Sequence, residues 1–528
     1  MGRFLKKGND GFRAVLNGEF VDKSVLIDII NATLNTERQF TCVSRARRFG
    51  KSIGARMLYA YYDQWCAPED LFLNLKVHNS SSFHTHFHRY PVLYLDMTDF
   101  ITRYRTEDIV AHIQLDVIEE LKEVFPNVPY RANSDLADTL YAIASQSQQE
   151  KFIMIIDEWD AILRERPEGD VASEQYINLL RGLFKSTNAM STFAGGYMTG
   201  ILPIKKYKTQ SALNNFHEYS VVQPGPMAEC FGFTSDEVKG LCAKYDMDYN
   251  TIAEWYDGYQ IGASKAMFNP TSVMTAIYNK YCDSYWSNAA AYDTIANYIR
   301  MNFDGLKDDV IRLLAGESCS VDTVSFQNDL NVVRSKDDVL TLLIHLGYLS
   351  YDRDSRTCRI PNREVANEFK NAVVLETGWD VIAKAIRQSE QLLKDTIAGK
   401  EEAVAEAIDA IHADNTSVLK YNDENSLACV LTIAYYSAKK DYMMIREMPT
   451  GKGFADIVLL PRPASSKPAI VLELKYDLSA DSAIAQIHER RYAGALHEYV
   501  GDVILVGINY DRATKLHWCK IERIGIVV

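Results

Sequence analysis

The chain has 528 residues, more than one ordinary hydrophobic core supports, so its length suggests roughly three or four structural units. Hydrophobic residues make up 47% of the sequence and charged residues 24%, a balance that is typical of folded proteins and excludes a disordered chain. The net charge of -13 opposes constitutive nucleic-acid binding over the whole surface, because a negative surface and the phosphate backbone repel each other. Any nucleic-acid site must therefore be a local basic groove.

Targeting and cysteine usage favour a cytoplasmic protein. Residues Met1 to Asp10 contain no apolar signal-peptide segment, and no window reaches the apolar length of a membrane-spanning helix. The nine cysteines, from Cys42 to Cys519, occur singly and form no CxxC pair, which argues against a zinc site or a disulfide framework. We therefore predict reduced thiols, a cytoplasmic location and no membrane partner. The oligomeric state is left open, with a homo-oligomer among the options.

The first 220 residues alternate amphipathic helical stretches with short apolar runs. Three of these runs are Tyr90 to Asp96, Phe152 to Asp157 and Ser191 to Gly200. Strands that alternate with helices in this way predict a parallel α/β sheet.

The middle of the chain has a different pattern. Residues 232 to 310 are helical in spacing and rich in aromatic side chains, most of which we expect in the core. Residues 335 to 360 predict a helix that ends at Gly347 and then a hairpin, a winged-helix-like ending. Residues 376 to 415 have helical spacing and predict a connecting helical hairpin. After about Asn422 the α/β pattern returns, with strands predicted near Tyr442 to Arg446, Ala455 to Leu460, Ala469 to Leu474 and Val503 to Ile508.

Residues 41 to 52 end an apolar strand and run through Gly50, Lys51 and Ser52 into a helical stretch. A strand, a loop and a helix N-terminus in this order form a phosphate site, because the first backbone N–H groups of the helix face the anion. Lys51 would reach the β and γ phosphates of a nucleotide, and the Ser52 hydroxyl would bind Mg²⁺. The pattern departs from GxxxxGK[ST] because Arg45 replaces the first glycine, and a lone Gly-Lys-Ser is weak evidence.

A second buried strand strengthens the phosphate site. It begins at Phe152 and ends in Asp157 and Glu158, where a parallel sheet places its ligands. Asp157 would hold the Mg²⁺ shell, Glu158 would orient the attacking water, and Thr199 at the end of a third strand would sense the γ-phosphate. The alternative is that Asp157 and Glu158 only open the next helix as cap and dipole partner.

The following segments carry a family resemblance: FVDKS (Phe20 to Ser24), SRARRFGKS (Ser44 to Ser52), IIDEWDA (Ile155 to Ala161), TGILPI (Thr199 to Ile204) with Ser211 and Asn214-Asn215, FGFTSDEV (Phe231 to Val238), and WYDGYQI (Trp255 to Ile261) with Asn269-Pro270. With them most of the chain resembles the bacterial AAA-ATPase-like family, whose members typically also carry a C-terminal PD-(D/E)XK nuclease-superfamily domain. The family's usual loop resembles Arg-Pro-Arg-Arg-Phe-Gly-Lys-Ser, so Arg45 is a family trait and Ala46, in place of proline, is a departure.

Three arginines, Arg45, Arg47 and Arg48, lie beside the phosphate loop in the sequence. Their guanidinium groups would offset phosphate charge that the missing glycine's backbone contacts leave exposed. A structural salt-bridge role is an equal alternative.

Residues 451 to 475 bring two carboxylates and a lysine to one edge of a predicted hairpin. Glu473 and Lys475 project to one face of a strand because side chains alternate, and Asp456 starts the partner strand. The hard carboxylate oxygens of Asp456 and Glu473 suit Mg²⁺ or Mn²⁺. Such a metal lowers the pKa of a bound water and screens a scissile phosphate, while Lys475 would position that water or stabilise developing charge. The alternative is a set of solvated charges on an edge hairpin.

This spacing resembles the D-(x)n-ExK pattern of the PD-(D/E)XK superfamily, with Ala455 where the motif has proline. In related nucleases a helical glutamate is often an extra metal ligand, a role that the resemblance implies for Glu424. In the same nucleases a glutamine and a tyrosine often lie near the phosphate, and the resemblance implies this position for Gln486 and Tyr492. Glu447 precedes the glycine turn of the same region. A solvated helix face is the equal alternative for these four residues.

The motifs and the resemblance together predict a nuclease controlled by a nucleotide. We expect an ATP-binding, ATP-regulated nuclease with ATP and Mg²⁺ or Mn²⁺ as cofactors and nucleic acid, DNA favoured, as its partner. Defence against foreign DNA or mobile-element biology is the hypothesis for its role. The alternative is a nucleotide-dependent switch or partner-binding protein whose nuclease-like domain binds without cutting. The intact carboxylate and lysine set favours the nuclease, whereas the acidic charge and the irregular phosphate loop favour the switch.

The predicted fold class is multidomain α/β, with a P-loop parallel α/β ATPase core, a helical and winged-helix-like middle, and a C-terminal restriction-endonuclease-like α/β domain. The predicted domains are an AAA-ATPase-like P-loop domain at 1–225, a helical lid and winged-helix-like region at 226–375, a helical connector at 376–415 and a PD-(D/E)XK nuclease-like domain at 416–528.

Overall fold

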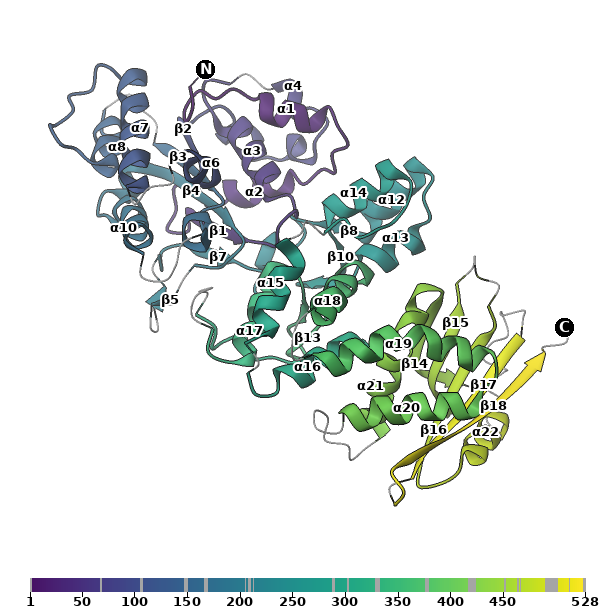
Figure 1. Cartoon of the computed structure of the whole chain (residues 1–528). Coiled ribbons are helices and arrows are strands. Elements are labelled where there is room, and N and C mark those ends of the chain that lie inside the picture. The colour runs from purple at the N-terminus through teal and green to yellow at the C-terminus, as the bar shows by residue number, and fades with distance from the viewer. Residues whose placement is uncertain are drawn as a thin grey trace. The chain divides into compact units, whose positions relative to one another are not determined.

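The computed structural model divides into two compact units, Met1–Trp286 with Ser320–Val365 and Ser287–Cys319 with Ala366–Val528 (Figure 1). There are fewer units than the length suggested, because the winged-helix-like hairpin belongs to the first unit and the helices of the predicted connector belong to the second. The structure describes residues 2–66, 69–104, 108–146, 151–165, 170–204, 206–207, 210–211, 213–286, 290–301, 303–327, 333–375, 379–415, 424–450, 453–462, 465, 467–489, 502–511 and 513–525.

A parallel five-stranded sheet forms the centre of the first unit. The strand order is β2-β3-β4-β1-β7, and each neighbouring pair is parallel. Because β4 lies between β1 and β3, the carboxyl ends of these three strands lie side by side at one edge of the sheet. The strands are β1 (Phe40–Ser44), β2 (Val92–Asp96), β3 (Phe152–Asp157), β4 (Phe193–Gly200) and β7 (His217–Tyr219).

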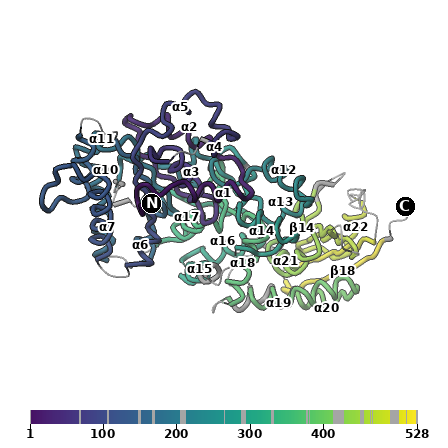
Figure 2. The backbone as a smooth tube through the Cα atoms, turned by 90° about the horizontal axis from the view of Figure 1, so that it is seen from above, coloured from purple at the N-terminus to yellow at the C-terminus, as the bar shows by residue number. Residues whose placement is uncertain are grey.

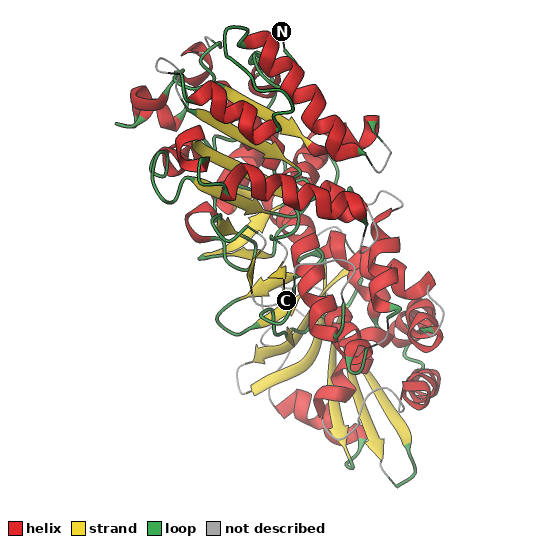
Figure 3. Ribbon diagram, turned by 90° about the vertical axis from the view of Figure 1, so that its left-hand side faces the viewer, coloured by secondary structure: helices red, strands yellow, loops and turns green. Residues whose placement is uncertain are grey.

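Helices cover both faces of this sheet (Figure 3). Alternate residues of β3 point to opposite sides, as strand geometry requires. Ile153 and Ile155 face α2 and α3, whereas Met154 and Ile156 join a core cluster with α7, α8 and α10. The helices are α1 (Asp10–Leu16), α2 (Val25–Asn31), α3 (Lys51–Tyr62), α4 (Glu69–Phe72), α5 (Phe83–His86), α6 (Met97–Arg103), α7 (Ile109–Val124), α8 (Leu136–Ala144), α9 (Ala161–Glu165), α10 (Val171–Lys185) and α11 (Ala189–Thr192).

The rest of the first unit combines helices with short strands. Thr234 begins α12 with a capping box that includes Glu237, and Asn269 caps α14 ahead of Pro270. Gly347, with φ 88°, ends α17 before the antiparallel hairpin of β12 and β13, which confirms the predicted winged-helix-like ending. The elements are β5 (Lys206–Tyr207), β6 (Gln210–Ser211), η2 (Gly225–Met227), β8 (Phe233–Thr234), α12 (Ser235–Tyr245), α13 (Tyr249–Tyr256), β9 (Tyr259–Ile261), β10 (Ser264–Phe268), α14 (Pro270–Asn279), α17 (Lys336–Leu346), β12 (Ser350–Asp352) and β13 (Thr357–Arg359).

The second unit is built on a mixed five-stranded sheet in the order β14-β15-β16-β17-β18. Only the β16–β17 pair is parallel among the described neighbours. The first four strands were predicted, whereas β18 was not. They are β14 (Tyr442–Thr450), β15 (Gly453–Pro461), β16 (Ala469–Tyr476), β17 (Asp502–Asp511) and β18 (Leu516–Gly525).

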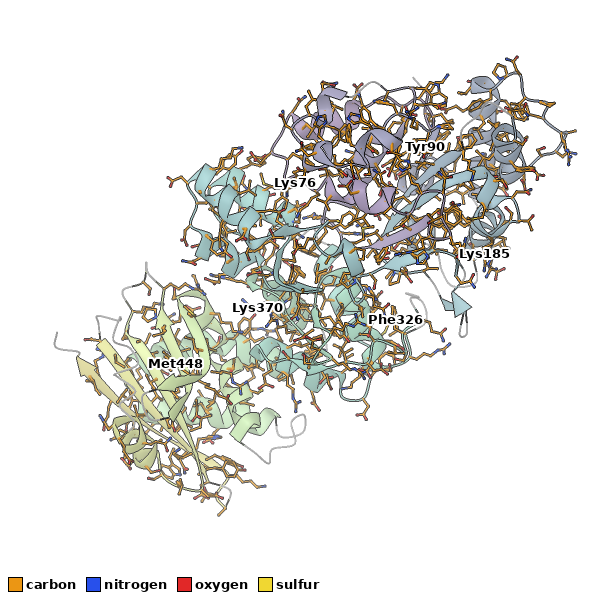
Figure 4. All side chains as sticks on the ribbon, turned by 180° about the vertical axis from the view of Figure 1, so that it is seen from behind. Lys76, Tyr90, Lys185, Phe326, Lys370 and Met448 are labelled. Carbon is orange, nitrogen blue, oxygen red and sulfur yellow. The ribbon has the colours of Figure 1, made fainter. Side chains whose placement is uncertain are left out.

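The helices of the second unit cover both faces of the sheet and one edge: α22 packs on one face, α21 contacts β15 and β16, and residues on the face opposite α22, such as Ile470 and Val506, are also fully buried. Ile484 and Ile487 of α22 pack on the sheet, and Met448 of β14, labelled in Figure 4, contacts the same cluster. Helices α19 and α20 run side by side (Figure 2). Carboxylates of α20 accept hydrogen bonds from backbone N–H groups of β18, at His517 and Ile521, which covers the open edge of the sheet. The helices are α15 (Ala290–Ile299), α16 (Leu306–Ala315), α19 (Asp380–Ile397), α20 (Glu401–Asn415), α21 (Glu424–Ala434) and α22 (Ala480–Glu489).

The chain passes between the units within β11 (Cys319–Ser320) and α18 (Arg363–Leu375), among other points. None of the helices in the described ranges is long and apolar enough to cross a membrane.

Candidate functional sites

The loop after β1 reaches α3 through two residues in the left-handed region. Arg48 has φ 70° and Gly50 has φ 88°, and Gly50 directly precedes the first helical residue. Glycine takes this backbone without the strain that a side chain brings. Ala46, where the family's loop has proline, packs tightly on Gly347: a Cβ on that glycine would lie 2.5 Å from the Ala46 Cβ. The winged-helix-like region therefore supports the phosphate loop from within the same unit.

Lys51 begins α3, and its side chain is 3% exposed. Its ammonium donates a hydrogen bond to the Ala46 carbonyl at 3.2 Å and lies 3.4 Å from a carboxylate oxygen of Glu158. A buried ammonium needs such partners, because water no longer solvates it. These contacts hold the Lys51 ammonium at the loop where it was predicted to bind phosphate.

Asp157, at the end of β3, accepts hydrogen bonds from the Tyr94 hydroxyl at 3.1 Å and from Ser52. Burial raises the pKa of this carboxyl to about 6; the hydrogen bond from Ser52 opposes the rise, and the charges of Asp96 and Glu158 add to it. Asp157 and Ser52 therefore meet as the oxygen pair that the sequence predicted for Mg²⁺.

Glu158 has φ 51°, in the left-handed region, and its carboxylate lies between two cations. One oxygen faces Lys51, and the other lies 2.7 Å from the Arg164 guanidinium. Arg164 also contacts Asp160, which accepts hydrogen bonds from the backbone of Ile201 and its neighbour. These contacts fix Glu158 beside the phosphate loop.

Thr199 of β4 stands between the two halves of the site. It is the register partner of Val43 on one side and of Asp157 on the other. Its hydroxyl is fully buried and has no hydrogen-bond partner in the part of the chain that the structure describes. Buried hydroxyls normally have partners, so this group fits a polar ligand such as a phosphate oxygen.

The three arginines separate into different environments. Arg45 is fully buried and donates to the backbone carbonyls of Ser44, Tyr219 and Met227, and burial lowers its pKa to about 10. All of these contacts lie inside the protein, so they support a structural role for Arg45 over phosphate binding. The partners are backbone carbonyls and not the carboxylates of a salt bridge. Arg47 is exposed. Arg48 donates a hydrogen bond to the Tyr285 carbonyl at 2.6 Å, so its guanidinium is directed toward the segment that follows α14.

The C-terminal set gathers where β15 and β16 end their pairing. The last register pair is Ile457 with Leu472, and one residue further on the Asp456 carboxylate accepts the Leu474 backbone N–H at 2.7 Å. Glu473 is 1% exposed, and the Lys475 ammonium lies 3.2 Å from its carboxylate. Asp456, Glu473 and Lys475 therefore share one corner of the sheet.

Gln486 of α22 donates a hydrogen bond to the same Glu473 carboxylate, so it is part of this site. The Glu424 side chain and Tyr492 lie outside the described residues. Glu447 has φ 47° and stands opposite Asp456, between the register pairs Arg446–Ile457 and Met448–Ala455, with its side chain exposed. No three His, Cys, Asp or Glu side chains converge as a metal site within the described ranges. Asp456 and Glu473 are thus two hard oxygen donors that fit a cation completed by further ligands.

Several site residues were not anticipated. Tyr94 supports Asp157 from the neighbouring strand, and the alternation in the run Tyr90 to Asp96 could have placed it beside that carboxylate. Arg164 holds Glu158, and its spacing of four residues from Asp160 on a short helix was a readable signal.

Each of the two candidate sites lies in a segment that matches the model of a known protein family. A family model described as a predicted AAA-ATPase matches residues 10–209, and a model of the PD-(D/E)XK nuclease superfamily matches residues 422–518. A search of curated proteins found no match. Among solved structures, AMPPCP-bound DnaA from Aquifex aeolicus is similar at 8% identity over 81% of this chain and 90% of that chain, with a TM-score of 0.21, which is too low to support a conclusion. The chain therefore joins a predicted AAA-ATPase domain to a domain of the PD-(D/E)XK nuclease superfamily.

Proposed function

We propose that the chain is a metal-dependent nuclease whose activity is regulated by ATP bound at the N-terminal site. The observation that carries the nuclease proposal is the corner of the second sheet, where two carboxylates and a lysine, Asp456, Glu473 and Lys475, come together. DNA is the favoured substrate, and defence against foreign DNA or mobile-element biology is the hypothesis for its role.

At the N-terminal site, the first N–H groups of α3 and the Lys51 ammonium would bind the phosphates of ATP. A phosphate oxygen would compete with Glu158 for Lys51, because the two now lie 3.4 Å apart. Ser52 and Asp157 would hold Mg²⁺, and the buried hydroxyl of Thr199 would donate to the terminal phosphate. Glu158, once released from Lys51, would accept the proton of an attacking water.

At the C-terminal site, Asp456 and Glu473 would hold Mg²⁺ or Mn²⁺. When bound, such an ion lowers the pKa of a coordinated water and screens the charge of the scissile phosphate. Lys475 would stabilise the charge that develops on the phosphate, since its side chain is only 15% exposed and its ammonium already lies 3.2 Å from Glu473. Gln486 holds Glu473 in place from α22.

The alternative is a nucleotide-dependent switch that binds nucleic acid or protein without cutting. One observation favours it: the described residues supply no group of three or more metal-ligating side chains. Such a protein would bind its partner through the second unit and change affinity with ATP.

A cleavage assay separates the two proposals. The full chain is incubated with single-stranded and duplex DNA and RNA, with Mg²⁺, Mn²⁺ or a chelator, and with or without ATP. The nuclease proposal expects cleavage that needs the metal and is lost in Asp456→Asn, while Asp481→Asn, an exposed carboxylate on α22, cuts normally. Tight binding without any cleavage in either metal would instead establish the switch.

A further inference from the structure

The unpredicted strand β18 carries two side chains onto the face of the sheet that holds the candidate nuclease residues. In the register, Lys475 pairs with Asn509, and Asn509 pairs with Trp518. Residues opposite each other on neighbouring strands project to the same face. This face is the one covered by α22, because Glu473 reaches Gln486 of that helix. Trp518 therefore lies two strands from Lys475, roughly 10 Å away across the sheet.

Trp518 is unusually exposed for its size. It is 59% exposed, and it makes no ring contact with another aromatic side chain in the part of the chain that the structure describes. Two further exposed apolar residues belong to the same region: Leu516, two residues away on the same face of β18, is 47% exposed, and Leu478, which follows β16, is 65% exposed. The backbone N–H of Leu478 donates to the Asn509 side chain, which is the register neighbour of Trp518. We call Leu478, Leu516 and Trp518 the tryptophan patch.

Two lysines lie beside the tryptophan patch, where their ammonium groups would fit the phosphates of a nucleic-acid strand. Lys475 lies in the same cross-strand row, and Lys520 follows Trp518 on the same face of β18. Both ammonium groups also have a carboxylate nearby, Glu473 at 3.2 Å from Lys475 and Glu401 at 3.5 Å from Lys520, and Asp511 lies opposite Leu516 on the same face. The Lys520 side chain is 42% exposed. An aromatic face flanked by ammonium groups matches the alternation of base and phosphate along a strand.

We infer that Trp518 stacks on an unpaired base of the nucleic acid that is cut at Asp456, Glu473 and Lys475. This inference rests on the proposed nuclease function and adds the class of substrate. In a duplex each base face is covered by its neighbours, so an exposed indole can stack only on a base that is single-stranded or at an unpaired end. The substrate is therefore a single strand or a duplex with an unpaired segment.

A binding experiment without cleavage tests the inference. The full chain is titrated, in a chelator, with a labelled oligothymidylate and with a blunt duplex of the same length. Trp518→Ala should weaken single-strand binding about tenfold, whereas Trp518→Phe should retain most of it, because a phenyl ring still stacks. Neither variant should change duplex binding or the unfolding temperature. The matched control is Met443→Ala, an apolar side chain that is 56% exposed on β14, the opposite edge of the same sheet.

Four outcomes would overturn the inference: no binding of the single strand by the wild type, unchanged affinity in Trp518→Ala, an equal loss on the duplex, or a loss of self-association that assigns the patch to a second copy. A cleavage assay run in parallel keeps the two claims apart. Metal-dependent cutting with a normal Trp518→Ala variant would leave the nuclease standing and remove the stacking role. Trp518-dependent binding of the single strand without any cutting would leave the stacking role standing and remove the nuclease.

Discussion

The two candidate sites differ in how completely the protein itself holds the functional side chains. At the N-terminal site Lys51, Asp157 and Thr199 are almost fully buried, and neighbouring residues position the two charged groups. At the C-terminal site Glu473 is buried, but Asp456 and Lys475 are partly exposed at the point where two strands part. The protein's own residues thus hold the charged side chains of the first site, whereas a metal and a substrate would complete the second site in the proposed nuclease.

This difference predicts where a substitution will be felt. Removing a charge from the N-terminal site leaves its buried partner without compensation, so a loss of stability should accompany the change in function. Replacing Asp456 or Lys475, which are partly exposed at the C-terminal corner, should change chemistry with little effect on folding.

The largest effect is expected at the C-terminal corner. Asp456→Ala and Glu473→Ala should each slow cleavage by at least about 10³-fold and weaken Mg²⁺ or Mn²⁺ binding, because each removes an oxygen ligand. Lys475→Ala should slow cleavage as much while metal remains bound, since the lysine carries no ligand oxygen. Calorimetric metal titrations beside the nuclease assay distinguish the variants. Cutting that survives all three changes would end the nuclease proposal.

Glu158→Gln should retain ATP binding and slow ATP turnover by about 10²- to 10⁴-fold, the range for loss of a general base. The amide no longer balances Lys51 and Arg164, so a lower unfolding temperature should accompany the loss. Steady-state phosphate release measures turnover, and Glu165→Gln, an exposed carboxylate of α9, is the control. Normal turnover in Glu158→Gln would leave Asp157 and Glu158 as a helix opening only.

Lys51→Ala should weaken ATP binding by roughly 100-fold, the scale of a charge-assisted hydrogen bond with phosphate. The effect should exceed that of Lys185→Ala, an exposed lysine at the end of α10 in the same unit. Equilibrium titration with a fluorescent ATP analogue gives both affinities. Equal affinity in Lys51→Ala and the wild type would remove Lys51 from the site.

Asp63 is a buried carboxylate of the first unit outside the nucleotide site, and it tests whether such burial lowers the free energy of unfolding. Its side chain is fully buried, and burial raises its pKa from 3.8 to about 6. A folded-state pKa above the unfolded value means that the folded state loses stability as pH rises through this window. Asp63→Asn should therefore gain on the wild type by up to about 3 kcal/mol between pH 4 and pH 6, then level off. Urea unfolding across pH measures this, and a constant difference would contradict it.

Tyr94→Phe should have the smallest effect, a three- to tenfold slower ATP turnover, since it removes one hydrogen bond worth about 1 kcal/mol from Asp157. Folding should be unchanged because the ring keeps its packing. Tyr141→Phe, 37% exposed on α8, is the matched control. A stronger loss in the control than in Tyr94→Phe would show that the hydroxyl of Tyr94 does not support the site.

Much of the first site follows from local sequence signals. An apolar run that ends in Asp157, and Gly50 before Lys51, place both groups at one sheet edge once the strands are parallel. The direction of Arg45 could not be predicted, because it depends on carbonyls at Tyr219 and Met227 that are remote in sequence. Such contacts are set by tertiary packing and leave no periodic pattern.

The second unit shows the same limit. Strands β14 to β17 are apolar enough to be recognised, and the spacing of Glu473 and Lys475 follows from alternation. Strand β18 was missed because the residues from Leu516 to Gly525 do not alternate cleanly between polar and apolar types, and because the α20 carboxylates that satisfy its outer edge are remote in sequence. Trp518 was missed with it, since its position beside Lys475 appears only through the register of three strands.

The most direct test of the central claim is cleavage by the full chain, with Mg²⁺, as a function of ATP concentration. The wild type should cut nucleic acid at a rate that changes with ATP, Lys51→Ala should lose the response to ATP, and Lys475→Ala should not cut at any ATP concentration. Cutting that is indifferent to ATP in the wild type, or that persists in Lys475→Ala, would contradict an ATP-regulated nuclease.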